Sequence, residues 1–388
     1  MRTAQLHLES SLNQSNSSRQ APSRILMTAD CVGGVWNYSL DLAEALAEFG
    51  VQVALATMGP RPSQKQREQA ARISTLKLFE SDYKLEWMDS PWADVDAAGI
   101  WLLDLARNLL PEVVHLNSYT HAGLPWNTPV VVVAHSCVKS WWKAVKSGPV
   151  PPVFAEYTRR VSDGLCHADL LIAPTNAMLN AIDQNYEHSV PAKVIPNGCF
   201  RTQYSPAAKM DFILTAGRLW DEAKGLPLLE RIAPKLRWPI YAAGENRHPS
   251  GSQARLRNIH LLGHLDNEKL AGYLGAASIY AAPALYEPFG LTVLEAALSG
   301  CALVLSAISS FRENWNDAAL LIPADDHDEW CTALDRLSSD RDLRLALARK
   351  ARDRAVELQP QEIGSRYFNI YCEVLAKHGS PNRENFGR

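Results

Sequence analysis

The chain has 388 residues, 47% of them hydrophobic and 21% charged, and a formal net charge of -3. That length is too great for one ordinary core and comfortable for two, and the near-neutral charge excludes an electrostatic footprint for nucleic acid. Seven scattered cysteines without a CxxC pair favour reduced thiols over a disulfide framework or a zinc site.

The first 22 residues are rich in Ser, Asn and Gln and lack the apolar core of a signal peptide, so we expect a disordered tail over 1–22. No apolar run reaches the roughly 18 residues that span a bilayer. We therefore expect a cytoplasmic protein. Peripheral contact with the inner membrane face stays open, although the overall charge does not indicate it.

Short apolar runs alternate with amphipathic helices along the rest of the chain. The segment Val35–Phe49 predicts such a helix, with an apolar stripe of Tyr38, Leu42, Leu46 and Phe49. Uninterrupted apolar runs are typical of parallel strands covered on both faces, so the alternation predicts a doubly wound α/β architecture. The expected strands are Ile25–Ala29, Val51–Thr57, Val113–Asn117, Val130–His135, Leu170–Pro174, Val194–Pro196, Phe212–Ala216, Ile240–Ala243, Ile259–Leu262, Ile279–Pro283, Ala302–Ser306 and Ala319–Pro323.

The turn-rich segment Asn197–Ala208 predicts a hinge between two domains. We expect a first Rossmann-like domain at 23–205 and a second at 206–358. A C-terminal segment at 359–388, with a predicted helix at Gln361–Lys377, is expected to cross back to the first domain. The carboxyl ends of both parallel sheets then face one cleft, where loop amides and helix N-termini bind ligands.

The most specific motif is Glu287-Pro-Phe-Gly-Leu-Thr-Val-Leu-Glu295, which follows a predicted strand and opens a predicted helix. The amides of Phe289, Gly290 and Leu291 then lie at a helix N-terminus, which suits a diphosphate. Glu295, one turn deeper, is placed to accept hydrogen bonds from a ribose diol, and Glu287 to lie near a sugar ring. A helix with an acidic first turn and no ligand is the ordinary alternative.

This motif resembles the donor-binding segment of the family 4 glycosyltransferases, the large retaining family with the GT-B fold of two facing Rossmann-like domains. Other segments resemble the family in the same order, over about residues 24–376: GGVWNYSLDLAEAL, VVVAHS, VIPNG, LTAGRLWDEAKGL and HLLGHLDNEKLAGYLGAAS. The resemblance implies a nucleotide-sugar donor and a glycan or glycolipid acceptor, and it places Thr292 among the donor-binding residues.

Arg218 and Lys224 follow a predicted strand and Gly217. Two fixed cations stabilise the negative charge that a nucleoside diphosphate gains as it leaves, and they make a divalent metal unnecessary. The resemblance gives the matching Arg and Lys this role, so we expect no metal and no other cofactor. Two solvated surface cations are the alternative for an isolated pair.

Gly33 and Gly34 follow the first predicted strand, where a turn lets the backbone face a diphosphate or an acceptor. The dinucleotide fingerprint is incomplete, and no acidic residue ends the second strand, which argues against a dehydrogenase. His135 ends a Val-rich strand at the cleft. The resemblance implies contact with the transferred sugar, and a hydrogen-bonded core histidine is the alternative.

Loops after later strands are expected to hold the nucleoside. By resemblance, Gly244 and Glu245 border its pocket, although many members of the family carry aspartate in place of Glu245. The turn Gly263-His264-Leu265 is expected to contact the base through its backbone, which leaves no side chain to distinguish uracil from guanine. Asn197 either lines the site or forms a plain turn.

Two other patterns are weighed against simple packing. Asp94 and Asp96 form a DxD, the metal-binding motif of the other large glycosyltransferase fold, but they start an amphipathic helix, where we expect an N-cap and a first-turn charge. Trp36, Trp141 and Trp142 lie near the expected acceptor side, and indole faces stack on sugar rings. Ordinary packing is their alternative.

These observations predict a metal-independent retaining hexosyltransferase. We expect UDP-hexose rather than GDP-mannose as its donor, a preference that rests on how often each donor occurs in the family. A GT-B phosphorylase, a nucleotide-sugar epimerase or hydrolase, and a non-catalytic nucleotide-sugar-binding subunit are the alternatives. No pyridoxal-phosphate lysine segment supports the first. The complete set of Arg218, Lys224, Glu287 and Glu295 argues against the last.

Overall fold

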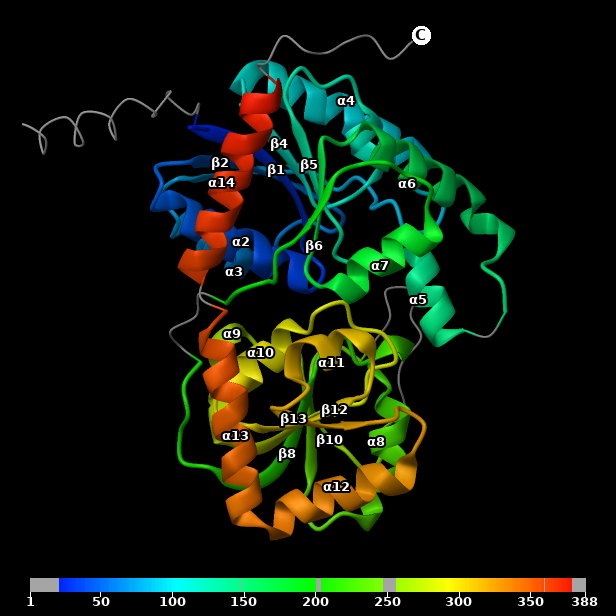
Figure 1. The fold of residues 1–388 in the computed structure, drawn as a ribbon, viewed down its shortest axis with the longest axis vertical. Coiled ribbons are helices and arrows are strands. Elements are labelled where there is room, and N and C mark those ends of the chain that lie inside the picture. The colour runs from blue at the N-terminus through cyan, green and yellow to red at the C-terminus, as the bar shows by residue number, and fades with distance from the viewer. Residues whose placement is uncertain (1–20, 147, 200–203, 247–255, 359, 379–388) are drawn as a thin grey trace, which may run out of the picture.

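The computed structural model describes residues 21–146, 148–199, 204–246, 256–358 and 360–378, so nearly all of the expected N-terminal tail at 1–22 lies outside the described residues. Two parallel sheets form two α/β domains, one above the other in Figure 1. This confirms the predicted α/β class with two doubly wound domains.

Both sheets share one order of six strands, to which the first sheet adds a seventh, β7, at its edge. The first runs β3-β2-β1-β4-β5-β6-β7 and the second β10-β9-β8-β11-β12-β13. The order reverses between β1 and β4 and between β8 and β11, and such switch points are where open α/β sheets bind ligands. The strands are β1 Arg24–Asp30, β2 Gln52–Met58, β3 Leu76–Glu80, β4 Val113–Leu116, β5 Val130–Val133, β6 Leu170–Ala173, β7 Ala192–Val194, β8 Met210–Ala216, β9 Ile240–Ala243, β10 His260–Gly263, β11 Ala277–Ala282, β12 Ala302–Ser306 and β13 Ala319–Ile322.

One strand was not predicted. Strand β3 pairs with β2 in parallel at the edge of the first sheet, with Leu78 opposite Leu55. Its side chains are half-buried or exposed. Its sequence, LKLFE, has a lysine between two leucines and ends in a glutamate, so it lacks the uninterrupted apolar run from which strands were predicted.

Helices cover both faces of each sheet. They are α2 Gly34–Ala47, α3 Gln64–Ala71, α4 Trp92–Leu109, α5 Val138–Val145, α6 Ala155–His167, α7 Asn176–Asn185, α8 Leu226–Ile232, α9 Asn267–Ala276, α10 Leu291–Leu298, α11 Ser309–Trp315, α12 His327–Ser339, α13 Arg341–Val356 and α14 Pro360–His378, with 3-10 turns η1 Thr120–Gly123, η2 Pro152–Phe154, η3 Glu222–Lys224 and η4 Ala233–Lys235. Within the described residues, no helix has the length and apolar character needed to cross a bilayer.

The apolar stripe predicted on the first helix is correct for three of its four residues. Tyr38, Leu42 and Leu46 are buried, but Phe49 lies beyond the end of α2 and is 38% exposed. Its ring stacks on Phe368 of α14 at a centroid distance of 4.6 Å. The helix ends two residues early because the chain turns at Gly50, which has a φ of +73°.

The last helix belongs to the core of the first domain. Figure 1 shows α14 running along that domain, beside α2. The Tyr38 hydroxyl donates to the Tyr367 hydroxyl at 2.7 Å. A Cβ added at Gly364 would lie only 2.5 Å from Ala45 Cβ, so the two helices are in direct contact. The far end of the chain thus completes the domain that its beginning starts.

Candidate functional site

Two loops meet at the switch point of the second sheet. Lys224, at the end of the loop after β8, donates from Nζ to Glu287 Oε2 of the loop after β11, at 2.6 Å. Gly225 follows with a φ of +65°, and a Cβ there would lie 1.8 Å from the Pro283 carbonyl oxygen. Only glycine fits this approach, which brings the predicted cation and the predicted carboxylate together.

Helix α10 begins at the same place. Its N-cap is Gly290, with a φ of +91°, and the first amides of a helix have no carbonyl partner inside it. A Cβ at Gly34, in the first turn of α2, would lie 3.2 Å from Leu291 Cδ1. The N-termini of two helices from different domains therefore face each other, and both carry the partial positive charge that favours an anion.

Arg218 reaches this junction from β8. A Cβ at Gly33 would lie 3.9 Å from Arg218 Nη1, so the guanidinium sits beside the glycine turn of the first domain. Its Nη2 donates to Asp221 Oδ2 at 3.0 Å, and the guanidinium carbon lies 5.5 Å from the centre of the Trp220 ring. The structure thus brings Arg218, Lys224 and the two helix starts to one point between the domains.

Asp30 ends β1 at this junction and was not predicted. Burial raises the pKa of its carboxyl to about 6. The Val32 amide, which donates to it at 2.7 Å, and the charge of Arg218 lower this pKa, but burial has the larger effect. The sequence carried a signal for it, since Asp30 comes directly after a buried strand at the carboxyl edge of the sheet.

The predicted donor residues on α10, and Phe289 just before it, lie deeper. Tyr280 Oη lies 2.9 Å from Thr292 Oγ1 and 3.2 Å from the Ala216 carbonyl, so Thr292 is held against two strands. Phe289 is packed in the core of the second domain. Glu295 is 4% exposed, which leaves little of its carboxylate surface open. Its contact with a ribose stays a prediction.

The loops expected around the nucleoside are joined by backbone contacts. Gly244 has a φ of +139°, and a Cβ there would lie 1.8 Å from the Gly217 carbonyl oxygen. Its amide donates to the Gly263 carbonyl at 2.8 Å, and the Glu245 carbonyl accepts from Leu219 at 2.8 Å. Close packing of three loops thus accounts for Gly244. Further along this edge, His264 is exposed and Leu265 half-buried.

His135 stands at the carboxyl end of β5. Its Nε2 lies 2.8 Å from Asn117 Oδ1, and Asn117 Nδ2 donates to the Thr28 carbonyl at 2.7 Å. That second bond orients the amide so that Oδ1 accepts from the imidazole, which leaves Nδ1 as the acceptor nitrogen. Burial, helped by the nearby His115, lowers the pKa of His135 to about 3. At neutral pH the ring is therefore uncharged.

A second histidine supports this arrangement from behind. His115 Nδ1 lies 2.7 Å from the Tyr371 hydroxyl of α14, and its Nε2 lies 3.2 Å from Asn117 Oδ1. Burial lowers the pKa of His115 to about 4. His115 and Asn117 were not predicted as site residues, although both belong to a run predicted as a strand, because nothing in that run shows which helix will cover it.

The three tryptophans have different surroundings. Trp36 is 3% exposed and donates to Gln69 Oε1 at 3.1 Å, so its ring belongs to the core. The acceptor-binding role predicted for Trp36 was therefore wrong. Trp141 donates from Nε1 to Asp221 Oδ1 of the second domain at 3.2 Å. The Trp142 ring lies 6.0 Å from that of Phe154. Sugar stacking by Trp141 and Trp142 stays a prediction.

Asn197 lies at the start of the predicted hinge, of which residues 200–203 are outside the described chain. It is 5% exposed, and within the described residues its Oδ1 has no hydrogen-bond partner. A Cβ at the neighbouring Gly198 would lie 2.6 Å from Ile363 Cδ1. The hinge therefore packs against the start of α14.

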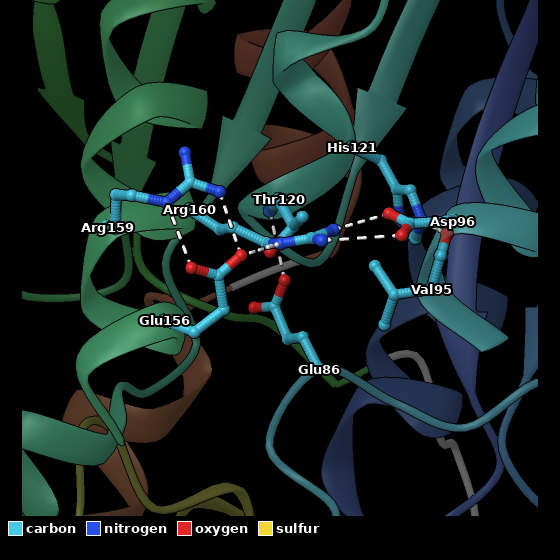
Figure 2. Close-up of polar contacts among 8 residues, drawn as sticks. All are labelled: Glu86, Val95, Asp96, Thr120, His121, Glu156, Arg159 and Arg160. Carbon is cyan, nitrogen blue, oxygen red and sulfur yellow. Dashed lines mark hydrogen bonds and ion pairs between the residues drawn. The ribbon is translucent and has the colours of Figure 1, made fainter. Parts of the chain in front are cut away.

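The aspartates of the DxD pattern lie away from this junction. Helix α4 begins at Trp92 with Pro91 as its N-cap, so neither aspartate is the cap, and that expectation was wrong. Asp94 lies in the first turn of the helix, as expected for one of the two aspartates. Figure 2 shows Asp96 facing Arg160 of α6, which contacts it through both Nη atoms and binds Glu156 through Nε at 2.7 Å.

Two family models match the chain. The model described as Glycosyltransferase Family 4 matches residues 32–199, and the one described as Glycosyl transferases group 1 matches residues 211–340. The first match includes β2 to β7 but begins after β1, the second covers the strands of the second sheet, and the gap between the two matches falls at the predicted hinge.

Curated relatives are glycosyltransferases with several different acceptors. The phosphatidyl-myo-inositol mannosyltransferase of Mycolicibacterium smegmatis is 29% identical over 46% of this chain and 51% of its own length. The glycogen synthase of Mycobacterium tuberculosis is 26% identical over 73% of this chain and 76% of its own. The D-inositol 3-phosphate glycosyltransferase of Corynebacterium aurimucosum is 23% identical over 89% and 92%.

Solved structures of GT-B glycosyltransferases share the fold. Sucrose-phosphate synthase of Thermosynechococcus elongatus superposes with a TM-score of 0.78 at 19% identity, covering 92% of this chain and 100% of that one. The HepE protein of Anabaena, solved with UDP-glucose, superposes with a TM-score of 0.71 at 15% identity, covering 91% and 99%. At such identities the likeness concerns the fold.

Proposed function

The chain belongs to the family 4 glycosyltransferases with the GT-B fold, and from that premise we propose that it transfers a hexose from a nucleoside-diphosphate sugar to a hydroxyl of a glycan or glycolipid, with retention of configuration and without a metal ion. The observation that supports this most is the junction where Arg218, Lys224 and the starts of α2 and α10 converge. We favour UDP-hexose as the donor, in line with the UDP-glucose bound by HepE.

In this proposal the leaving diphosphate lies at the junction. As the bond between the anomeric carbon and the phosphate oxygen breaks, the charge that develops meets Arg218, Lys224 and the amides at Phe289–Leu291. The acceptor oxygen bonds to the anomeric carbon on the same face, and its proton passes to the leaving phosphate oxygen. The neutral imidazole of His135 accepts a hydrogen bond from a sugar hydroxyl through Nδ1. This hydrogen bond orients the sugar for attack by the acceptor.

The site assignment is tested by two substitutions, Lys224→Ala and Glu295→Ala. Lys224→Ala is expected to lower transfer by at least roughly a hundredfold, the scale of losing one stabilising group at a developing charge. Glu295→Ala is expected to lower transfer through the loss of its hydrogen bonds to the ribose. In both variants, circular dichroism and the melting temperature should stay near wild type. Lys350→Ala, on the exposed face of α13, is the matched control and should transfer at the wild-type rate. Wild-type rates in both site variants would refute the assignment.

Metal independence has a separate test. Excess EDTA is expected to leave the rate of transfer unchanged, because two fixed cations replace the divalent ion. Loss of transfer in EDTA, restored by Mg²⁺ or Mn²⁺, would contradict this part of the proposal.

The donor is identified by thermal shift. Among a panel of nucleotide sugars, the true donor is expected to raise the melting temperature in proportion to the logarithm of its concentration above Kd. Donor breakdown measured with and without candidate acceptors then separates a transferase from a hydrolase or an epimerase, which need no acceptor.

A further inference from the structure

Helix α5 begins three residues after His135 and belongs to the first domain, yet several of its contacts are with the second. Figure 1 places it at the boundary between the two domains. Ser140 is its only buried residue, so α5 is held at the surface of its own domain by few core contacts. Ser140, Trp141 and Lys146 contact the two loops of the second domain that carry the proposed donor site.

The first contact leads to Arg218. Trp141 donates from Nε1 to Asp221 Oδ1 at 3.2 Å, and the other oxygen of this carboxylate accepts from Arg218 at 3.0 Å. Asp221 is 7% exposed, and its Oδ1 also accepts from the Ala223 amide at 3.0 Å. One nearly buried carboxylate therefore joins a helix of the first domain to the guanidinium of the second.

The second contact leads to Glu287. Tyr286, the residue before it, places its hydroxyl 2.8 Å from Ser140 Oγ and accepts from the Cys137 amide at 3.3 Å. Cys137 is the N-cap of α5, so the tyrosine enters the first turn of that helix. The side chain that fixes the backbone beside Glu287 is thus anchored in the other domain.

A third contact is an ion pair. Lys146 Nζ, at the end of α5, lies 2.6 Å from Glu222 Oε2, and the turn η3 that holds Glu222 ends in Lys224. The side chains are 33% and 62% exposed. Such exposed pairs stabilise little, so the hydrogen bonds of Trp141 and Tyr286 carry most of the effect.

We propose that Trp141, Tyr286 and Asp221 are positioning residues, through which α5 sets Arg218 and Glu287 in place when the two domains are closed. This rests on the proposed function of the same site. It gives Trp141 a role other than stacking on an acceptor: the indole N–H matters, and the ring face does not. Domain closure then assembles the charged groups as well as excluding water.

The proposal is tested by Trp141→Phe and Tyr286→Phe, which keep an aromatic ring at each position and remove the indole N–H and the tyrosine hydroxyl, respectively. Each variant is expected to lower kcat by about tenfold, the effect of losing a hydrogen bond to a charged group or within a buried pair, with the KM values for donor and acceptor nearly unchanged. Arg218, and Lys224 paired with Glu287, act on the charge that develops in the transition state, so the loss falls on kcat. An acceptor KM that rises while kcat holds would instead indicate sugar stacking and overturn the proposal.

Hydrogen–deuterium exchange gives a readout independent of turnover. In Trp141→Phe, with UDP present, faster exchange is expected in peptides covering 218–225, although the substitution lies in the other domain. Trp126→Phe is the matched control, because its indole donates to the His121 carbonyl at 2.8 Å within the first domain. Unchanged exchange at 218–225 in Trp141→Phe, or an equal rise in Trp126→Phe, would overturn the proposal.

The two proposals fail in different ways. If the wild-type protein neither binds UDP nor transfers sugar, the proposed function fails, while exchange at 218–225 measured without nucleotide still reports the link through Asp221. If the wild-type protein transfers sugar and both variants keep its kcat, the positioning role alone is refuted.

Discussion

At the scale of single residues, the buried histidines carry the clearest electrostatic consequence. His115, which is buried, and His135, which is half-buried, share one acceptor, Asn117 Oδ1, and their low pKa values, about 4 and about 3, keep both rings uncharged at neutral pH. An uncharged ring at His135 can accept a hydrogen bond from a sugar without adding a third positive charge to those of Arg218 and Lys224. The same burial makes the folded state sensitive to acid.

Acid sensitivity is tested with His135→Gln. The pKa of His135 is about 3 in the folded protein against an ordinary value of 6.5. Between these values the unfolded chain binds a proton that the folded chain does not, so this contribution to stability is complete above pH 6.5 and is lost as the pH falls. The wild-type melting temperature is therefore expected to fall more than that of His135→Gln between pH 7 and pH 4.5. Parallel falls in the two proteins would contradict the assignment.

Gly244 gives a second test at this scale. Gly244→Ala is expected to lower the free energy of unfolding of the second domain by more than about 1 kcal/mol. The new Cβ would clash with the Gly217 carbonyl, and the backbone φ of +139° is one that alanine rarely adopts. Gly272→Ala on α9, where no atom lies within 4 Å of the new Cβ, is the control. It is expected to be neutral or to stabilise by up to about 1 kcal/mol. Urea unfolding measures both, and equal midpoints would contradict the packing described for Gly244.

At the scale of elements, the sequence predicted the features that depend on local pattern and did not predict the contacts between segments far apart in the chain. The strand before Glu287 and the helix after Gly290 were predicted correctly, because an apolar run, a glycine and an amphipathic run lie next to each other in the chain. The partners of Asp221 and Tyr286 were not predicted. They lie 80 and 146 positions away in the sequence, on Trp141 and Ser140, and no local pattern indicates which distant helix will meet a loop.

Helix α14 shows the same limit and allows a test. The Tyr371 hydroxyl lies 2.7 Å from His115 Nδ1. Tyr371→Phe leaves that buried nitrogen without its partner and is expected to cost about 1–3 kcal/mol of the free energy of unfolding. Tyr273→Phe on α9 is the control. Tyr273 is 36% exposed, so this substitution should change the free energy of unfolding by less than about 0.5 kcal/mol. If urea unfolding shows no difference between the two variants, the hydrogen bond contributes nothing.

At the scale of the whole molecule, contacts between the domains occur on more than one side of the junction. Glu313 of α11 accepts from the amides of Asn176 and Ala177 at 2.8 and 2.9 Å, at the N-terminus of α7. Lys65 of α3 lies 2.8 Å from Asp266, which caps α9. The arrangement described therefore has the two domains in contact, with α5, α7 and α3 all facing the second domain.

The Lys65–Asp266 pair gives a test of that arrangement. Lys65→Glu places like charges together and is expected to favour separation of the domains at low salt, seen as a larger radius of gyration in small-angle X-ray scattering. Adding Asp266→Lys restores opposite charges and should return the radius to that of wild type. Because the pair is worth only about 0.2–1 kcal/mol and is screened by ions, the difference should disappear near 1 M salt. A radius independent of these substitutions at low salt would show that the pair does not hold the domains.

The return of α14 to the first domain also bears on how the protein is made. Chains are synthesised from the N-terminus, and domains commonly fold in that order. Here the core around β1 and α2 includes Ile363, Tyr367, Ile370 and Tyr371, so it lacks one wall until the last helix leaves the ribosome. The second domain is translated later but can complete its own core earlier. The first domain keeps apolar surface exposed until α14 has been made, at the stage when chaperones bind nascent chains.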